Sequence, residues 1–315
     1  MIRKLLLSAG ALLLSANMAN ADLLALGSTA TGGTSQIGRA LAAAISEASP
    51  HQMRPQEVAN TSDYIPLVNA GELEFGIANV VQTYYFKTGT GMSEGRPNPD
   101  IMMAATLMPF RAAFIVPADS DIQSVADLKG KRVPSFSEGA LGYHVVNAYL
   151  ANAGLTEADV EPVPVPNFPR MWSSFGDGTT DVTVVVVGAA NAREFDATMG
   201  GIRYLDFDES PEAVARMNEY LPQMYLTTVG PEAEIPGIDV PTDIMTYDYT
   251  LFAARTTKDE VVYDVVKAVY ESQEQLLQTG PFFAGLSGDR MGMDVDIEYH
   301  PGAITFYEEI GIWNR

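Results

Sequence analysis

The sequence predicts an α/β protein of two domains, and three observations support this. Short apolar segments alternate with loops rich in Ser, Thr, Gly and Asn and with segments of helical apolar spacing, which is the pattern of strand–loop–helix units. A second series of such units begins after Pro117. The chain has 315 residues, and because domains usually run to about 100–200 residues, this length suits two.

The N-terminus of the chain has the features of a signal peptide. Arg3 and Lys4 give a positive start, Leu5–Leu14 is an apolar run, and Ala19–Ala21 matches an A-x-A cleavage site. We therefore expect cleavage after Ala21 and export to the periplasm. The apolar run is shorter than the about 20 residues that span a bilayer, and no later stretch reaches that length without charges.

The composition is strongly acidic. The formal net charge is −21, and loss of Arg3 and Lys4 from the 19 basic residues leaves 17 against 40 acidic residues, a charge of −23. Because nucleic acids and anionic membrane surfaces repel such a charge, we expect neither as a partner. The chain has no cysteine, which excludes disulfides, thiol nucleophiles and thiolate metal sites.

The segment Leu23–Ala44 contains the first candidate site. It consists of an apolar strand, a Ser/Thr/Gly loop and a helix with apolar residues at helical spacing. Two adjacent glycines let a ligand approach the backbone, and the free N–H groups of a helix N-terminus favour an anion. A simple turn explains the same residues, and because the loop has neither a P-loop Lys nor G-x-G-x-x-G, we expect no nucleotide cofactor. The candidate ligand contacts here are Thr31, Gly32, Gly33 and Thr34.

Two further strands are predicted to end in polar residues at the same edge of the sheet. A strand over Arg54–Asn60 leads into the cluster Asn60–Asp63, which has the character of a helix cap, and a buried strand within Gly71–Asn79 ends at an asparagine. Ligands of open α/β sheets bind at the carboxyl ends of strands. We therefore predict that Asn60 and Asn79 join the glycine loop in one site.

The second series repeats this pattern. Tyr84–Asn98 is predicted as a loop or broken helix and Ile101–Val116 as one or two strands, and then a strand over Arg132–Phe136 precedes a polar loop and a helix from Tyr143 onward. A buried strand over Asp181–Val187 follows later. A second helix N-terminus can thus face the first across a cleft, with candidate contacts at Ser137, Gly139, Ala140 and Gly188.

Arginines are the candidates for holding a carboxylate, since a guanidinium can form two parallel hydrogen bonds with it. Arg111, between Phe110 and a buried strand, is the first choice, ahead of Arg170 and Arg193. An ordinary solvated or structural role is the more common one for an arginine and is the alternative for each of the three. Aromatic residues could cover an apolar part of a ligand, and the candidates are Tyr84, Tyr143, Trp172 and Tyr225.

Two other chemistries are weighed against ligand binding. Asp294, Asp296, Glu298 and His300 alternate, so on an extended strand they would put four possible metal ligands on one face, but an exposed polar face explains this as well and no metal is predicted. A serine hydrolase would need G-x-S-x-G, which Gly285–Gly288 does not match, and no paired general acid and base stands out. We do not expect an enzyme.

Four segments in chain order resemble the substrate-binding proteins of TRAP transporters of the TAXI subfamily. Thr31–Thr34 carries the Gly-Gly-Thr loop, Gly71–Ile77 a typical helix-to-strand step, Asp127–Val133 a "DLkGkrV" segment and His300–Glu309 the late "HPGA" segment. The "DLkGkrV" segment is shared by many bacterial binding proteins. The resemblance to this subfamily therefore depends on its combination with the Gly-Gly-Thr loop and the "HPGA" segment.

The resemblance implies a type II periplasmic-binding fold, in which two α/β lobes joined by hinge strands close over a ligand. After a signal peptide over residues 1–21, lobe 1 would comprise residues 22–116 and 246–315, and lobe 2 residues 117–245. The implied function is that of a periplasmic receptor, expected as a monomer, which delivers a small organic acid, dicarboxylate or amino-acid-like, to TRAP membrane subunits. A periplasmic sensor of the same fold that signals to a membrane receptor is the alternative.

The chain departs from the family pattern at both halves of the cleft. Asn79–Val81 replaces Gln-Ser-Asp, and Gly139–Gly142 replaces Gly-Ser-Gly-Thr, so side-chain hydroxyls and a carboxylate are lost. A pocket with fewer donors suits a less polar acid.

Overall fold

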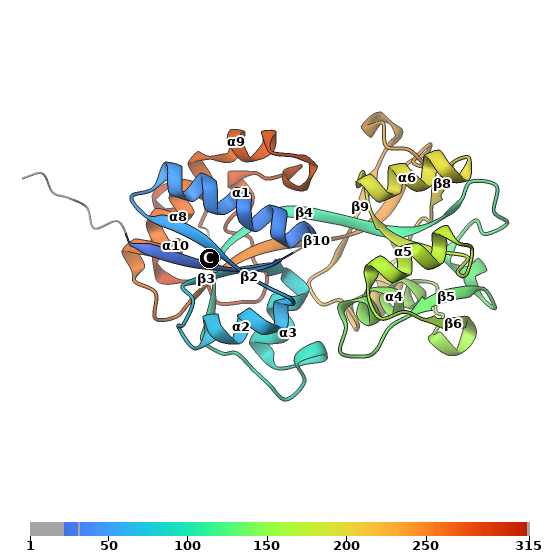
Figure 1. Cartoon of the computed structure of the whole chain (residues 1–315), viewed down its shortest axis with the longest axis horizontal. Coiled ribbons are helices and arrows are strands. Elements are labelled where there is room, and N and C mark those ends of the chain that lie inside the picture. Colours follow the sequence, from blue (N-terminus) through green and yellow to red (C-terminus); the bar gives the residue numbers. More distant parts are fainter. Residues whose placement is uncertain (1–21, 31, 314–315) are drawn as a thin grey trace, which may run out of the picture.

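The computed structural model describes residues 22–30 and 32–313 of the chain. The described residues form two lobes joined by two long strands (Figure 1), which confirms the predicted two-lobe α/β fold. The predicted signal peptide and the predicted contact Thr31 lie outside the described residues. Within the described part, none of the helices combines the length and apolarity that crossing a bilayer requires.

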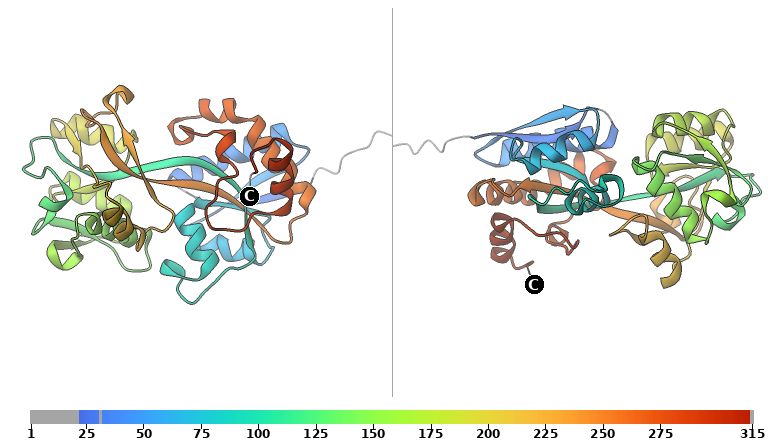
Figure 2. Two further views of the ribbon diagram at one scale, coloured as in Figure 1. Left: turned by 180° about the vertical axis from the view of Figure 1, so that it is seen from behind. Right: turned by 90° about the horizontal axis from the view of Figure 1, so that it is seen from below.

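Two long strands, β4 (Ile101–Pro117) and β10 (Thr242–Ala254), pair antiparallel with each other and run through both lobes (Figures 1 and 2). Almost every residue of both strands is buried, as expected for strands covered on both faces. The region predicted as one or two strands is therefore one. The ladder is irregular beside Pro109, whose nitrogen carries no hydrogen, and a register shift follows between Asp248 and Thr250.

Lobe 1 joins the N-terminal units to the C-terminal helices (Figure 1). Its strands β1, β2 and β3 run parallel, and β10 pairs with β3. Phe252 packs with α2 whereas its neighbours Leu251 and Ala253 pack in the cluster of α1 and α8, so helices cover both faces. The elements are β1 (Leu23–Thr29), β2 (Gln52–Val58), β3 (Phe75–Asn79), α1 (Gly32–Ala48), α2 (Thr61–Asn69), α3 (Val80–Thr88), α8 (Asp259–Glu271), α9 (Gln273–Gln278) and α10 (Pro301–Glu309).

Lobe 2 is built on the far halves of the long strands (Figure 1). In it β4 pairs with β7 and β8, β10 pairs with β9, and β5 and β6 form a parallel pair. Tyr149 anchors this lobe, because its ring packs edge-on against Phe114 and its hydroxyl donates to the Ala112 carbonyl at 2.7 Å. The elements are β5 (Arg132–Ser135), β6 (Glu161–Pro164), β7 (Thr183–Val186), β8 (Ile202–Tyr204), β9 (Tyr225–Val229), α4 (Leu141–Asn152), α5 (Phe168–Gly176), α6 (Ala190–Met199) and α7 (Pro211–Asn218).

The pairing of β4 with β7 begins at Ala112, and the predicted lobe boundaries stay a prediction. The extended strand on which the alternating residues 294–300 would share one face does not form: apart from one bridge between Tyr299 and Met103 the segment is irregular. Asp296 has a φ of 55°, a left-handed conformation that breaks strand alternation.

Candidate functional site

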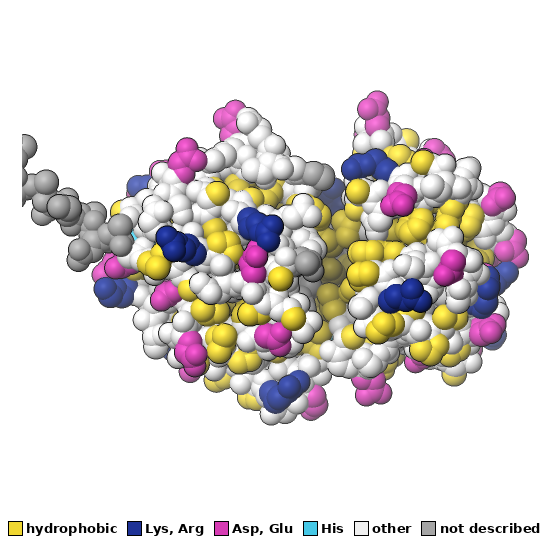
Figure 3. Space-filling view, in the orientation of Figure 1, with side chains coloured by type: hydrophobic (Ala, Val, Ile, Leu, Met, Phe, Trp, Pro, Cys, Tyr) yellow, Lys and Arg dark blue, Asp and Glu magenta, His cyan; other side chains and the backbone are white. Residues whose placement is uncertain are grey.

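The candidate site is the groove between the two lobes. The carboxyl ends of β1 and β3 in lobe 1 and of β5 and β7 in lobe 2 are each followed by a helix. Figure 3 shows a groove between the lobes in which apolar side chains are visible in the depth. An open α/β sheet binds ligands at this position, and here two lobes offer such an edge.

Four aromatic residues, which we call the aromatic floor, lie where the long strands leave lobe 1: Phe110, Tyr247, Tyr249 and Phe282. The Phe110 ring is nearly parallel to those of Tyr247 and Phe282, with ring centroids 5.6 Å and 6.4 Å away, and it lies 5.3 Å from Tyr249. Phe110 and Phe282 are partly exposed and the two tyrosines are buried. The floor is therefore an apolar surface that is partly open to solvent at Phe110 and Phe282.

The N-terminus of α1 lies against this floor. The Thr34 and Tyr249 hydroxyls are 2.8 Å apart, and a Cβ at Gly33 would lie 3.3 Å from the Phe282 ring. Glycine at this position lets the ring pack over the first turn of the helix. Burial raises the pKa of Tyr249, although the Thr34 hydroxyl opposes this, so Tyr249 is a neutral hydrogen-bonding group at any physiological pH.

Lobe 2 contributes two helix N-termini without a side-chain cap. Ala140 precedes α4 and Ala189 precedes α6, and neither can accept a hydrogen bond through its side chain. The predicted contacts Ser137 and Gly139 are exposed, and Gly188 accepts a hydrogen bond from the Arg193 guanidinium at 2.7 Å. The backbone N–H groups of these first turns can therefore bind a ligand or water.

The two predicted asparagines act as helix caps. Asn79 is 2% exposed, its side-chain oxygen accepts from the Gln82 backbone N–H at 2.9 Å, and its amide donates to the Gln82 side chain. Asn60 is exposed and forms a capping box with Asp63. Both lie at strand ends as predicted, but their side chains are engaged locally, so direct contact with a ligand stays a prediction.

Arg111 lies on the opposite face of the β4–β10 strand pair from the aromatic floor. It pairs with Thr246 while its neighbour Phe110 pairs with Tyr247, and side chains of successive strand residues point to opposite faces. Its Nε is buried without a hydrogen-bond partner. The predicted role of Arg111 as a carboxylate clamp stays a prediction, and the floor itself offers no support for it.

Tyr225 joins a buried ion pair that sequence reasoning missed. Arg290 donates to the Asp248 carboxylate at 2.7 Å and to the Tyr225 hydroxyl at 2.9 Å. Burial alone would lower the pKa of Arg290, but Asp248 and Tyr225 outweigh it and raise that pKa. Asp248 lies within an otherwise apolar strand, and a buried carboxylate needs a partner. The position of this aspartate in the sequence was therefore the one signal that could have indicated a buried ion pair. The trio ties the C-terminal segment of lobe 1 to β9 of lobe 2.

A second contact between the lobes lies at α3. The Tyr85 hydroxyl donates to the Tyr220 carbonyl at 2.6 Å, and the Tyr85 ring is 4.9 Å from that of His144 on α4. Burial raises the pKa of Tyr85 to about 12 and lowers the pKa of His144. Both groups are therefore neutral near pH 7 and hold the lobes together through hydrogen bonding and packing.

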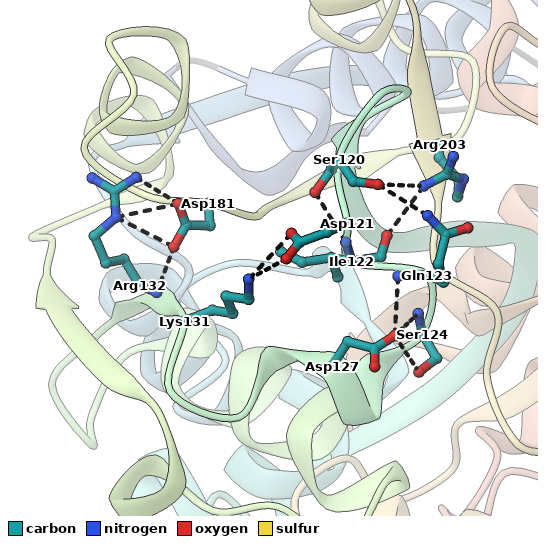
Figure 4. Close-up of polar contacts among 10 residues, drawn as sticks. All are labelled: Ser120, Asp121, Ile122, Gln123, Ser124, Asp127, Lys131, Arg132, Asp181 and Arg203. Carbon is teal, nitrogen blue, oxygen red and sulfur yellow. Dashed lines mark hydrogen bonds and ion pairs between the residues drawn. The ribbon is translucent and has the colours of Figure 1, made fainter.

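The far end of lobe 2 holds a cavity of ≈ 390 Å³ whose charged side chains pair with one another. Lys131 binds Asp121 at 2.9 Å and Arg132 binds Asp181 through two nitrogens, as Figure 4 shows. Its lysine and its arginine are thus already paired with carboxylates, and of its remaining polar lining the Thr180 hydroxyl has no hydrogen-bond partner among the described residues.

The alternating acidic residues do not gather around a metal position. Glu298 pairs with Arg255 at 2.8 Å, and His300 caps α10 by accepting from the Gly302 N–H at 3.3 Å. Among the described residues, no three His, Asp or Glu side chains are placed to hold a metal ion.

A sequence profile of the NMT1-like family matches residues 26–311. Among solved structures, the chain is similar to the periplasmic aliphatic sulphonate binding protein SsuA from Escherichia coli, with a TM-score of 0.53 and 17% identity over 84% of this chain and 78% of that one. It is similar to a TctC solute binding protein from Polaromonas (TM-score 0.54, 18% identity, 83% and 88% covered). It is also similar to PhnD1 from Prochlorococcus marinus (MIT 9301), solved in complex with methylphosphonate (TM-score 0.55, 11% identity, 93% and 99% covered). At such identities these likenesses concern the fold.

Proposed function

This chain belongs to the NMT1-like family and has the two-lobe fold of periplasmic solute-binding proteins, and from this premise we propose that it is the solute receptor of a TAXI-type TRAP transporter. In this proposal it binds a small organic acid between its lobes in the periplasm, as a monomer, and delivers the acid to the membrane subunits of the transporter. The TAXI resemblance by itself points to a dicarboxylate or an amino-acid-like acid.

One observation carries the proposal: the N-terminus of α1 meets the aromatic floor at the edge where the two lobes face each other. The helix N-terminus supplies N–H donors and a favourable potential for a carboxylate. If it accepts from the Tyr249 hydroxyl, the Thr34 hydroxyl can donate to the carboxylate, and the rings of Phe110 and Phe282 offer apolar surface. The site thus suits an amphipathic acid. We propose Gly32, Gly33 and Thr34 as the carboxylate contacts.

The mechanism we propose is a hinge equilibrium. A ligand that contacts the first turn of α1 and the first turns of α4 or α6 stabilises the closed arrangement only through contacts that the open one lacks. The irregular ladder beside Pro109 is where the connecting strands can bend most easily. No step of bond making or breaking is involved.

The test is a thermal-shift screen of the mature protein, unfolded and refolded to strip bound solute, against organic acids and amino acids. A ligand at a hundred times its dissociation constant adds about 2.7 kcal/mol to the free energy of unfolding, which is a shift of several degrees. Thr34→Val should weaken binding about tenfold through loss of one hydrogen bond. Leu277→Ala, on the exposed side of α9, is the matched control. If no acid or amino acid raises the melting temperature, the receptor proposal fails.

A further inference from the structure

We propose that the solute is a monocarboxylic acid with a planar aromatic body, an inference that rests on the proposed function. Its first basis is the geometry of the aromatic floor. Tyr247, Phe110 and Phe282 form a row of rings with interplanar angles of 5° and 7°. Phe110 and Phe282 are partly exposed, so a ligand ring can extend the row. Offset-stacked rings attract each other beyond what burial of their area gives.

Lobe 2 also has aromatic side chains that are partly exposed, as the aromatic floor of lobe 1 has. Phe168 and Trp172 lie in α5, which follows the carboxyl end of β6, and both are partly exposed with ring centroids 6.2 Å apart. The Trp172 Nε1 donates to the Val184 carbonyl at 2.9 Å, which fixes the ring and satisfies its polar atom. Because β5 and β6 run parallel, these rings follow the same sheet edge as the loop that leads from β5 into α4. Figure 3 shows apolar side chains in the groove between the lobes.

The second basis is the scarcity of positive charge. Within residues 22–30 and 32–313, no lysine or arginine side chain has a hydrogen bond or ion pair with the aromatic floor or with the first turn of α1. Arg290 is bound to Asp248, and Arg193 to the Gly188 carbonyl. Arg111, whose Nε has no hydrogen-bond partner in the described part of the chain, lies on the opposite face of the β4–β10 pair from the rings. A second carboxylate lying against the rings would lose its hydration without gaining a cation. One acid group at α1 and an apolar remainder fit these residues.

The third basis is the spacing between the helix N-terminus and the rings. A Cβ at Gly33 would lie 3.3 Å from the Phe282 ring, so the ring lies close over the first turn of α1, where a side chain would otherwise project. A carboxylate bound at that turn therefore has its ring next to Phe282 when acid group and ring are joined directly or through one carbon. Benzoate and phenylacetate are acids of this shape.

The experiment compares phenylacetate with cyclohexylacetate, a saturated acid of similar size, by calorimetric titration of the stripped protein. The wild type should bind phenylacetate about fivefold more tightly, since only that ring stacks. In Phe282→Leu, which keeps apolar area but no ring, the two affinities should become nearly equal. Gly33→Ala, whose methyl group would displace the Phe282 ring, should also reduce the ratio of the two affinities. Leu277→Ala is the control and should keep the wild-type ratio.

The outcomes separate this inference from the function on which it rests. If succinate, glutamate or 2-oxoglutarate binds more tightly than any aromatic acid, the inference is overturned and the receptor function stands; the acid then spans from α1 to the N-terminus of α4 or α6. Equal affinities of the wild type for the two acetates would overturn it as well. If no acid binds at all, the proposed function itself is wrong.

Discussion

Replacing Arg290 by methionine should lower the free energy of unfolding by about 2–3 kcal/mol, because it leaves a buried carboxylate without its cation. The Asp248 side chain is 3% exposed and that of Arg290 is 29% exposed. The substitution also removes the donor to the Tyr225 hydroxyl at 2.9 Å. Methionine keeps an unbranched apolar stem, so packing along the side chain is largely preserved.

The magnitude follows from the burial of the two partners. Removing one member of a fully buried ion pair costs about 3–5 kcal/mol. The partial exposure of Arg290 lets water reach the vacated position and reduces that cost, whereas a fully exposed pair would contribute about 0–1 kcal/mol. A loss of 2–3 kcal/mol corresponds to a fall in melting temperature of roughly 4–10 °C for a domain of this size.

Urea unfolding of the variant measures this loss, with Arg54→Met, an exposed arginine of β2, as the control that should stay within about 0.5 kcal/mol of wild type. The double variant Arg290→Met/Asp248→Leu removes both charges and should recover about 1 kcal/mol or more relative to the single variant. If Arg290→Met is as stable as Arg54→Met, or if the double variant is the least stable of all, the reasoning about the buried pair is refuted.

Three further predictions concern single positions. Tyr85→Phe removes the donor to the Tyr220 carbonyl and should cost about 1 kcal/mol in urea unfolding; a neutral result would show that water replaces this contact between the lobes. Burial lowers the pKa of His300, so the unfolded chain binds a proton that the folded chain resists, and stability falls as pH drops below about 6.5. His300→Asn keeps a cap and should reduce the slope of the stability profile between pH 7 and 5.5, with the part due to the lowered pKa of His144 remaining, whereas an unchanged slope would contradict this. Gly302→Ala places a Cβ 2.1 Å from the Asp259 carbonyl and should cost at least about 2 kcal/mol; a melting temperature equal to wild type would rule out that contact.

Local patterns predicted most of the fold. The apolar run at Leu23–Leu26 and the helical spacing after Gly33 indicated β1 and α1, and the polar cluster after β2 indicated the start of α2. These signals depend only on neighbours in the chain, which is why they could be recognised without a structure. The long β4 was less certain, because periodicity cannot tell whether one buried apolar run is a single strand or two.

The candidate site was harder to predict because it depends on register and on distant segments. Whether Arg111 or Phe110 faces α1 is decided by the pairing of β4 with β10, and a shift of one residue would exchange them. Phe282 and Arg290 reach the hinge strands from a segment far along the chain, and no motif surrounds either. Asn79 shows the opposite difficulty: an asparagine at a strand end suits a helix cap as well as a ligand contact, and here it is a cap.

The most direct test of the account is small-angle X-ray scattering of the stripped mature protein with and without a saturating acid identified by the thermal-shift screen. If the acid is held between the lobes, its binding must reduce the radius of gyration, because closure brings the lobes together. Thr34→Val should need a higher acid concentration for the same reduction. Tight binding with an unchanged radius of gyration would contradict the account, since the acid would then bind without closing the groove.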